Sequence, residues 1–303
     1  MSQKSPQELK EIIETGEIPI YRTALDACAA GNKKLVKSFV EKYPDVIKDA
    51  EQKPMKPQDM HSNDEEDGET LFGAACREGQ LAIARYLLSV KDSIDLDVHH
   101  GEEYALRHAS RKGKTLMVKW LLGLNLDKPI NINALSDNAW ESACEGGHLQ
   151  ILKYLQAYSK KHNMQIIYNS DGDVVPTICE NGHMEVLKYL IEELGLFVGD
   201  AEWKKDCQDD IYWFMECAAD NDKHRILDYI RCIYNHMMGK EIPIPIEILY
   251  RSISKDSRDA AEICLRSLTS IRYSDIKKLK EMVKSSEHVG QSEWFDELLK
   301  SVL

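Results

Sequence analysis

Ala143-Cys144-Glu145-Gly146-Gly147-His148-Leu149 is a stretch that returns, altered but in register, along most of the chain. A cysteine or serine fills its second position in each copy: Cys28, Cys76, Ser110, Cys144, Cys179 and, in a sixth copy, Cys217. A glycine follows the first five of these by three residues: Gly31, Gly79, Gly113, Gly147 and Gly182. These glycines are 48, 34, 34 and 35 residues apart. A period near 34 holds two helices and a turn, so the sequence predicts a solenoid of repeats.

The two predicted helices of each repeat differ in composition. The first carries small residues, as in Ala74-Ala75-Cys76, and the second carries aliphatic pairs such as Ile151-Leu152 and Val186-Leu187. This combination resembles the ankyrin repeat, whose second half is similar to residues 147–155 and 182–190. The Thr-Pro-Leu-His start of that family is altered in every copy, beginning with Thr23-Ala24-Leu25-Asp26. The resemblance covers roughly residues 21–235.

The resemblance implies an all-α fold, an ankyrin-type α-solenoid of about six helix-turn-helix repeats with helical caps. We expect a capping helix in residues 1–20, ankyrin repeats in 21–238 and a further helical region in 239–303. The 48-residue interval includes an acidic, proline-bearing insertion at about 51–68, which we expect to form an extended loop. In the sixth repeat, Asn221-Asp222 are expected to lengthen the turn between the helices.

The region 239–303 allows two interpretations. Its first two helical patterns, residues 246–254 and 258–268, fit a degenerate seventh repeat. The last two, residues 274–285 and 292–302, have apolar positions at helical spacing. They would either cap the solenoid, as repeat arrays require, or form a separate docking element.

Composition excludes several classes of function. The formal net charge is −12 and no Lys/Arg run stands out, which argues against nucleic acid as a partner. The chain has no apolar run of about 18 residues, so no membrane span is predicted. The polar start Met1-Ser2-Gln3-Lys4-Ser5-Pro6 does not read as a signal peptide. Equivalent cysteines in neighbouring helices, about 8–10 Å apart, would be too distant to pair, which predicts free thiols and a cytoplasmic location.

Residues typical of catalysis or metal binding are scarce. Cys207 is the one cysteine in a predicted loop, and its neighbouring carboxylates would raise the pKa of a thiol. The pair His99-His100 has no further ligand at suitable spacing. We therefore predict no enzyme activity, no catalytic residue, no cofactor and no metal. The aromatic residues Tyr86, Trp120, Tyr154, Tyr189 and Tyr229 recur on second helices, which indicates packing between repeats more simply than a stacking surface. Trp140 and Trp213 are expected in the core.

The resemblance also implies where a partner protein would bind: the finger loops and the exposed ends of the first helices. The positions in this sequence are Arg77, Glu78, His100, Glu103, Arg111, Lys112, Asp137, Glu145, Tyr168, Glu180, Asn181 and Trp203. Aromatic and Arg side chains commonly anchor interfaces, so Arg77, Arg111 and Trp203 are the expected anchors. We predict a monomeric scaffold or adaptor for protein–protein interaction. The alternative is that residues 239–303 form a catalytic or modifying module targeted by the repeats.

The divergent repeats look like those of intracellular bacteria, giant viruses and protists, and resemble those of intracellular-bacterial effectors. Residues 287–303 are acidic and then apolar, and are loosely similar to the carboxy-terminal export signals of such effectors. This suggests the hypothesis of a secreted effector that acts on a host protein in the host cytosol.

Overall fold

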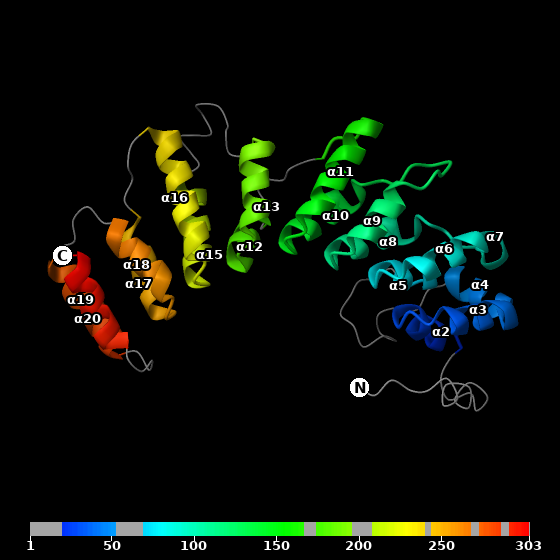
Figure 1. The fold of residues 1–303 in the computed structure, drawn as a ribbon, viewed down its shortest axis with the longest axis horizontal. Coiled ribbons are helices and arrows are strands. Elements are labelled where there is room, and N and C mark those ends of the chain that lie inside the picture. Colours follow the sequence, from blue (N-terminus) through cyan, green and yellow to red (C-terminus); the bar gives the residue numbers. More distant parts are fainter. Residues whose placement is uncertain are drawn as a thin grey trace. The chain divides into compact units, whose positions relative to one another are not determined.

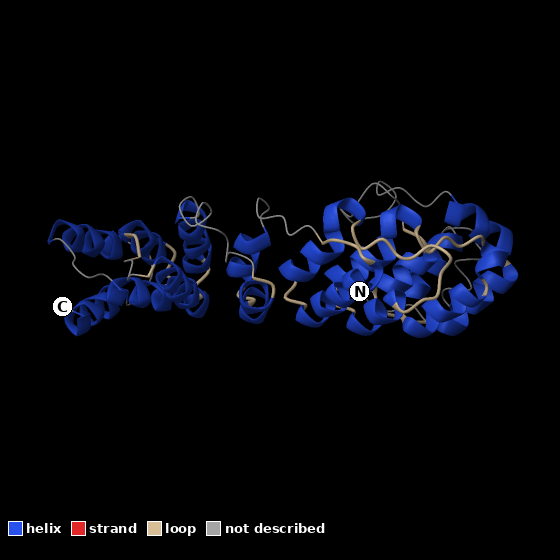
Figure 2. Cartoon of the chain, turned by 90° about the horizontal axis from the view of Figure 1, so that it is seen from above, coloured by secondary structure: helices blue, strands red, loops and turns tan. Residues whose placement is uncertain are grey.

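The computed structural model describes residues 20–52, 69–166, 174–195, 208–239, 244–267, 273–285 and 291–302. Helices joined by loops and turns make up these segments, which confirms the all-α prediction (Figures 1 and 2). The chain divides into two compact units, residues 1–168 and 169–303, which are described separately. The predicted capping helix lies outside the described residues except for Ile20, the first residue of α2.

The first unit is built from helix pairs. Its helices are α2 (Ile20–Ala29), α3 (Lys33–Lys42), α4 (Pro44–Gln52), α5 (Leu71–Arg77), α6 (Leu81–Ser89), α7 (Lys91–Ile94), α8 (His100–Arg111), α9 (Thr115–Leu122), α10 (Ala134–Glu145) and α11 (Leu149–His162). The first helices of successive repeats pack side by side in the order α2, α5, α8, α10, while α3 packs on α6 and α9 on α11 (Figure 1). Each repeat therefore adds one helix to each of two layers.

The turn between the paired helices has a constant hydrogen-bond pattern. The Lys114 N–H donates to the Ala109 carbonyl at 2.9 Å, and the Gly113 N–H donates to the Ser110 carbonyl at 3.1 Å. This is the Schellman pattern, which requires a left-handed residue, and Gly113 has φ +66°. The bond to the carbonyl five residues earlier recurs after the left-handed residue of each turn between paired helices in the described chain: Gly31, Gly79, Gly113, Gly147, Gly182, Asp222 and Asp256.

The sixth turn corrects the predicted register. Asp222 takes the glycine position with φ +53°, and the Lys223 N–H donates to the Ala218 carbonyl at 2.8 Å. The turn therefore has the same length as the others, and the predicted lengthening at Asn221-Asp222 is wrong. Ala219, two residues after Cys217, occupies the cysteine position. Asp256 repeats this geometry between α17 (Ile246–Ser254) and α18 (Arg258–Ser267), so this pair shares the repeat turn.

The small residues of the first helices lie in the core. Cys28, Cys76 and Cys144 are fully buried, and burial raises the pKa of each of these thiols. The seven described cysteines are all free, as predicted. Cys232 is exposed and the other six are buried.

The second unit continues the paired arrangement. Its helices are α12 (Val174–Asn181), α13 (Met184–Lys188) continuing into the π-helical η2 (Tyr189–Glu193), α15 (Gln208–Asp220), α16 (His224–Met238), α17, α18, α19 (Tyr273–Ser285) and α20 (Gln291–Val302). Within it, α12, α15, α17 and α19 are successive neighbours, and α18 packs on both α16 and α20. Trp140 is buried in the first unit, as expected, but Trp213 on α15 is 44% exposed, so its predicted core position is wrong.

The insertion after the first repeat is partly helical. Residues 51 and 52, placed by the sequence in an extended loop, end helix α4, and Glu51 is buried. The Glu51 Oε1 accepts hydrogen bonds from the Leu71 N–H at 2.7 Å and the Tyr21 hydroxyl at 2.9 Å. Leu71 begins α5, so this carboxyl group joins the insertion to both flanking repeats. The predicted loop at 53–68 lies outside the described residues.

Burial raises the pKa of the Glu51 carboxyl group from 4.5 to about 7. The folded state then binds this proton more tightly than the unfolded state, so stability falls as pH rises from about 4.5 to 7. We expect this group to account for about 3 kcal/mol of unfolding free energy across that range, a loss that Glu51→Gln should abolish. Urea unfolding of both proteins between pH 5 and pH 8 measures the difference.

A second variant sharpens this prediction. The Tyr21 hydroxyl stabilises the ionised form of Glu51 by donating a hydrogen bond. Tyr21→Phe should therefore shift the loss of stability toward higher pH. Parallel stability curves for the wild type and Glu51→Gln would contradict the assignment.

Candidate partner-binding surface

Three predicted contact residues occupy the same position in successive repeats. Arg77, Arg111 and Glu145 are the last residues of α5, α8 and α10. Glu78 and Lys112 follow the first two as the C-cap residues. Because these first helices pack side by side, their ends form one edge of the first unit. We call Arg77, Glu78, Arg111, Lys112 and Glu145 the groove edge.

The cations of the groove edge differ in how they are held. The Arg77 guanidinium lies 3.2 Å from Glu69 Oε1 and 3.1 Å from Glu78 Oε1, and its side chain is 17% exposed. Arg111, Lys112 and Glu145 are exposed instead. The edge thus presents a basic spot at Arg111-Lys112, with Glu78 on one neighbouring repeat and Glu145 on the other.

Glu103 and Asp137, predicted as exposed finger residues, are buried, with 4% and 2% exposure. Glu103 Oε1 accepts a hydrogen bond from the Asn131 N–H at 2.9 Å and lies 2.7 Å from His99 Nδ1. Asp137 Oδ1 accepts a hydrogen bond from the Asn133 side-chain amide. The same amide also donates to the Gln165 carbonyl at 2.7 Å. Their predicted exposure at the finger tips is therefore wrong. Glu103 joins its loop to that of the next repeat, and Asp137 holds Asn133 within its own loop.

The same carboxylates complete two unusual backbone turns. Gly101, Glu102 and Glu103 are all left-handed at the start of α8, and Leu135, Ser136 and Asp137 are left-handed at the start of α10. Each left-handed non-glycine residue costs roughly 1–2 kcal/mol. The buried Arg107 offsets part of this cost, because its Nε and Nη2 donate to the carbonyls of Glu102 and Gly101 at 3.0 and 2.9 Å.

Truncation of the buried carboxylates should destabilise the fold. Glu103→Ala leaves the Asn131 N–H without its acceptor, and we expect a loss of about 1–3 kcal/mol of unfolding free energy. Glu145→Ala, at an exposed position, should change it by less than about 0.5 kcal/mol. Chemical denaturation compares the two, and equal effects would contradict a structural role for Glu103.

The remaining predicted contacts fall in different places. His100 is half-buried as the first residue of α8. Glu180 and Asn181 are exposed at the end of α12, in the second unit. Tyr168 and Trp203 lie outside the described residues. The first unit therefore carries the described groove edge, and Glu180 and Asn181 belong to the second unit.

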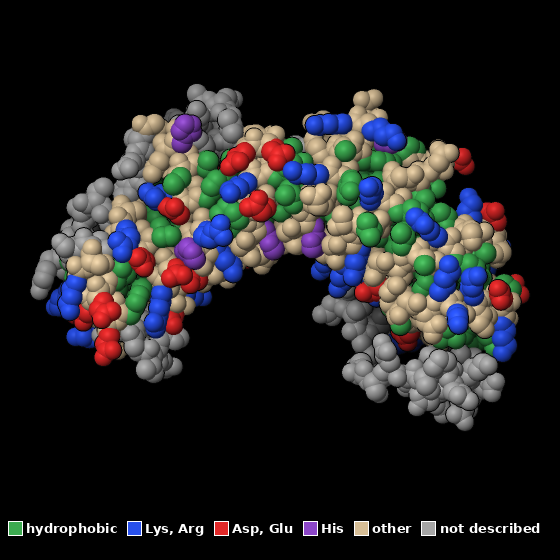
Figure 3. All heavy atoms as spheres, in the orientation of Figure 1, with side chains coloured by type: hydrophobic (Ala, Val, Ile, Leu, Met, Phe, Trp, Pro, Cys, Tyr) green, Lys and Arg blue, Asp and Glu red, His purple; other side chains and the backbone are tan. Residues whose placement is uncertain are grey.

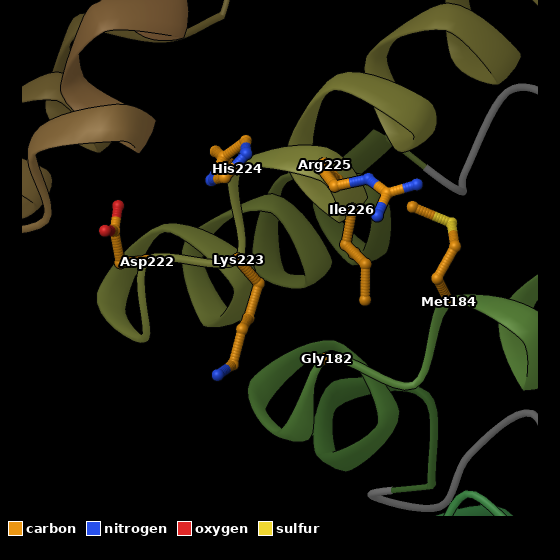
Figure 4. Close-up of a pocket in the computed structure, with 7 residues that line it drawn as sticks. All are labelled: Gly182, Met184, Asp222, Lys223, His224, Arg225 and Ile226. Atoms are coloured by element: carbon orange, nitrogen blue, oxygen red, sulfur yellow. The ribbon is translucent and has the colours of Figure 1, made fainter.

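A pocket of about 170 Å³ lies beside two turns of the second unit. Figure 4 shows Ile226 and Met184, from neighbouring repeats, facing one another, with Lys223 extending toward Gly182. A Cβ atom on Gly182 would lie 3.0 Å from Lys223 Cδ, so the lysine stem covers the glycine. Pockets for small ligands are commonly about 300–1,000 Å³, and we therefore assign no ligand to this one.

The repeated turns and paired helices have a counterpart among known families. A family model described as ankyrin repeats (3 copies) matches residues 24–136. Residues 24–136 therefore contain ankyrin repeats. The matched ankyrin repeats lie in the first unit and include Arg77, Glu78, Arg111 and Lys112 of the groove edge. The search of curated proteins found no match to the chain.

Ankyrin repeats support a general role in protein–protein interaction. Within the described segments, no helix is long and apolar enough to cross a membrane. The same segments contain no group of three or more His, Cys, Asp or Glu side chains that could hold a metal ion.

The predicted site residues did not include a periodic set of cations. Lys37, Arg85, Lys119 and Lys153 each follow their repeat glycine by six residues. Their shared repeat position, rather than a consecutive run of Lys and Arg, is the signal in the sequence that identifies them.

Proposed function

We propose that the first unit is an adaptor that binds a partner protein across its groove edge, with Arg111 and Lys112 at the centre of the contact. The observation that carries this proposal is the exposure of these two cations at the end of a first helix, with Glu78 and Glu145 at the neighbouring ends. Complementary charges of this kind steer association and select the partner.

The arrangement also defines what the partner must present. The Arg77 side chain is largely covered, whereas Arg111 and Lys112 are exposed, so these two residues present positive charge at the surface. An acidic or carbonyl-rich patch on the partner would face these two residues. Glu145 would face a donor or a cation one repeat away. Alternating charges specify orientation along the edge as well as binding.

Capture from eukaryotic cytosol at near-physiological salt tests this proposal. We expect Arg111→Glu/Lys112→Glu to reduce the bound partner by about tenfold, since charge reversal places like charges opposite one another. Lys48→Glu/Lys91→Glu makes the same change in charge at exposed positions on α4 and α7 and should retain the partner. Mass spectrometry identifies the bound protein and circular dichroism checks the fold. A partner captured equally by the wild type and the Arg111/Lys112 variant would refute the groove edge.

The hypothesis of a secreted effector extends the proposal to a host protein and the host cytosol. It is supported by the resemblance of the repeats and of residues 287–303 to bacterial effectors. Helix α20 buries Phe295, Leu298 and Leu299, while Glu293 and Glu297 are exposed.

Glu293→Lys/Glu297→Lys tests the export part of this hypothesis while keeping the buried apolar residues. We expect reduced delivery into host cells, because the substitutions remove the acidic character of the tail. A translocation assay against the wild type measures it, and unchanged delivery would exclude a role for these carboxylates. The alternative of a catalytic module in 239–303 gains no support, since α17 and α18 share the repeat turn.

A further inference from the structure

The second helices of the first unit are basic, although the whole chain carries a net charge of −12. The sequences of α6, α9 and α11 include no Asp or Glu, and α3 includes only Glu41. We define the basic face as the cations of these helices: Lys33, Lys34, Lys37, Lys42, Arg85, Lys119, Lys153, Lys160 and Lys161. All are exposed except the half-buried Lys153. Figure 3 shows Lys and Arg side chains spread across the first unit.

Four of these cations form a ladder with one member in each repeat. Lys37, Arg85, Lys119 and Lys153 occupy the same repeat position on α3, α6, α9 and α11. Packed helices lie about 8–10 Å apart, so the repeat sets the spacing between neighbouring charges. The ladder is therefore a regular row of cations rather than a local cluster.

Aromatic rings hold part of this ladder in place. The Lys37 Nζ lies 5.1 Å from the centroid of the Tyr86 ring, and the Lys119 Nζ lies 5.5 Å from that of Tyr154. In each case the lysine of one second helix covers the aromatic residue of another. The aromatic rings thus take part in packing between second helices, as predicted, and they limit the freedom of the ladder lysines. Ordering these side chains before binding lowers the entropic cost of capturing a ligand.

The second unit does not continue the basic face. Lys188 on α13 still takes the ladder position, and its Nζ lies 6.0 Å from the centroid of the Tyr229 ring. The segment α13–η2 also carries Glu185, Glu192 and Glu193, however, and Asp228 takes the ladder position on α16. Asp228 lies 2.6 Å from Arg231 in an ion pair. The separation of basic second helices from acidic residues is therefore a property of the first unit. A repeat protein does not need this separation to be hydrated.

We propose that the basic face binds an acidic segment of a partner protein in an extended conformation, with carboxylates at every third residue facing the ladder. In the polyproline II form of an extended chain there are three residues per turn and a rise of about 3.1 Å per residue, so every third side chain faces the same side and three residues span roughly one helix spacing. Leu116 lies on the same face of α9 and is 75% exposed, so it offers a contact for an apolar side chain of the segment.

Other polyanions fit the face less well. Single-stranded nucleic acid binding relies on bases stacking on aromatic rings, whereas Lys37 and Lys119 cover Tyr86 and Tyr154. A long polyanion would also be repelled by the acidic remainder of the chain. A short segment interacts mainly with charges within a Debye length of about 8 Å, and these belong to the basic face. For a membrane surface, Leu116 is the single large apolar side chain exposed on the described parts of these four helices, which gives little to insert.

Two synthetic peptides of identical composition test the charge spacing. One carries Glu at every third position around a central Leu, and the other carries the same Glu residues in one block. We expect the spaced peptide to bind the full chain about tenfold more tightly in fluorescence anisotropy. The affinity should weaken between about 0.05 and 0.15 M salt, since the contacts are exposed ion pairs.

Matched variants test the location. Arg85→Gln/Lys119→Gln/Lys153→Gln should weaken the spaced peptide by about tenfold, because each exposed ion pair contributes modestly and three are removed. Lys48→Gln/Lys91→Gln/Lys128→Gln removes the same charge from exposed positions elsewhere in the first unit and should change binding by less than about twofold. Glutamine keeps the helix and the side-chain stem, and thermal unfolding verifies the fold of each variant.

Three results would overturn the proposal. Equal affinity for both peptides would show that the spacing of the carboxylates does not matter. An equal loss of peptide affinity in both triple variants would show that the peptide does not bind at the ladder. Binding of phosphatidylserine vesicles or single-stranded RNA through the ladder, with no binding of the spaced peptide, assigns the face to another class of ligand. Arg111→Glu/Lys112→Glu should leave peptide binding unchanged, so failure of the groove-edge proposal and failure of this one are distinguishable.

Discussion

The structure depends on one backbone hydrogen bond, from the residue after each left-handed turn to the carbonyl five positions earlier. It fixes where the first helix ends and where the second begins, and it recurs after Gly113, Asp222 and Asp256 alike. Glycine meets the conformational requirement without a steric cost, and aspartate tolerates it. A constant turn places every helix pair in the same geometry, so residues one period apart arrive at equivalent places in the fold.

Buried carboxylates form a second constraint, acting between repeats rather than within them. Glu51 and Glu103 accept hydrogen bonds from residues 20 and 28 positions away, while Asp137 accepts one from Asn133, whose amide also donates to the Gln165 carbonyl. A buried carboxylate is tolerated only when such bonds compensate for lost hydration. These residues therefore specify how neighbouring loops meet, whereas apolar packing alone would permit small shifts. The exposed groove edge and basic face depend on this order, because their charges are useful only at fixed spacing.

The sequence predicted the helices and the repeat well, because period and turn glycines are local signals. The bounds of α17 match the prediction, while α18–α20 agree to within one residue. The errors arose where a pattern had more than one solution. The sequence placed Cys217 at the cysteine position of the repeat, but the hydrogen bonds of the turn show that Ala219 occupies it. Glu103 and Asp137 carry charge, which favoured a surface position, although their partners Asn131 and Asn133 lie about 30 residues and four residues away. No local signal indicates the distant partner of Glu103, and the contact of Asp137, although local, depends on Asn133 being held by the Gln165 carbonyl.

The distribution of thiols has a consequence for chemistry at the surface. The described cysteines lie one to a repeat over much of the array, and all but Cys232 are buried. Burial also raises the pKa of Cys76 and Cys179, which keeps them in the unreactive protonated form. Each buried thiol becomes reactive only when its own helix pair opens. The array consequently contains its own set of position-specific reporters for partial unfolding, distributed along its length.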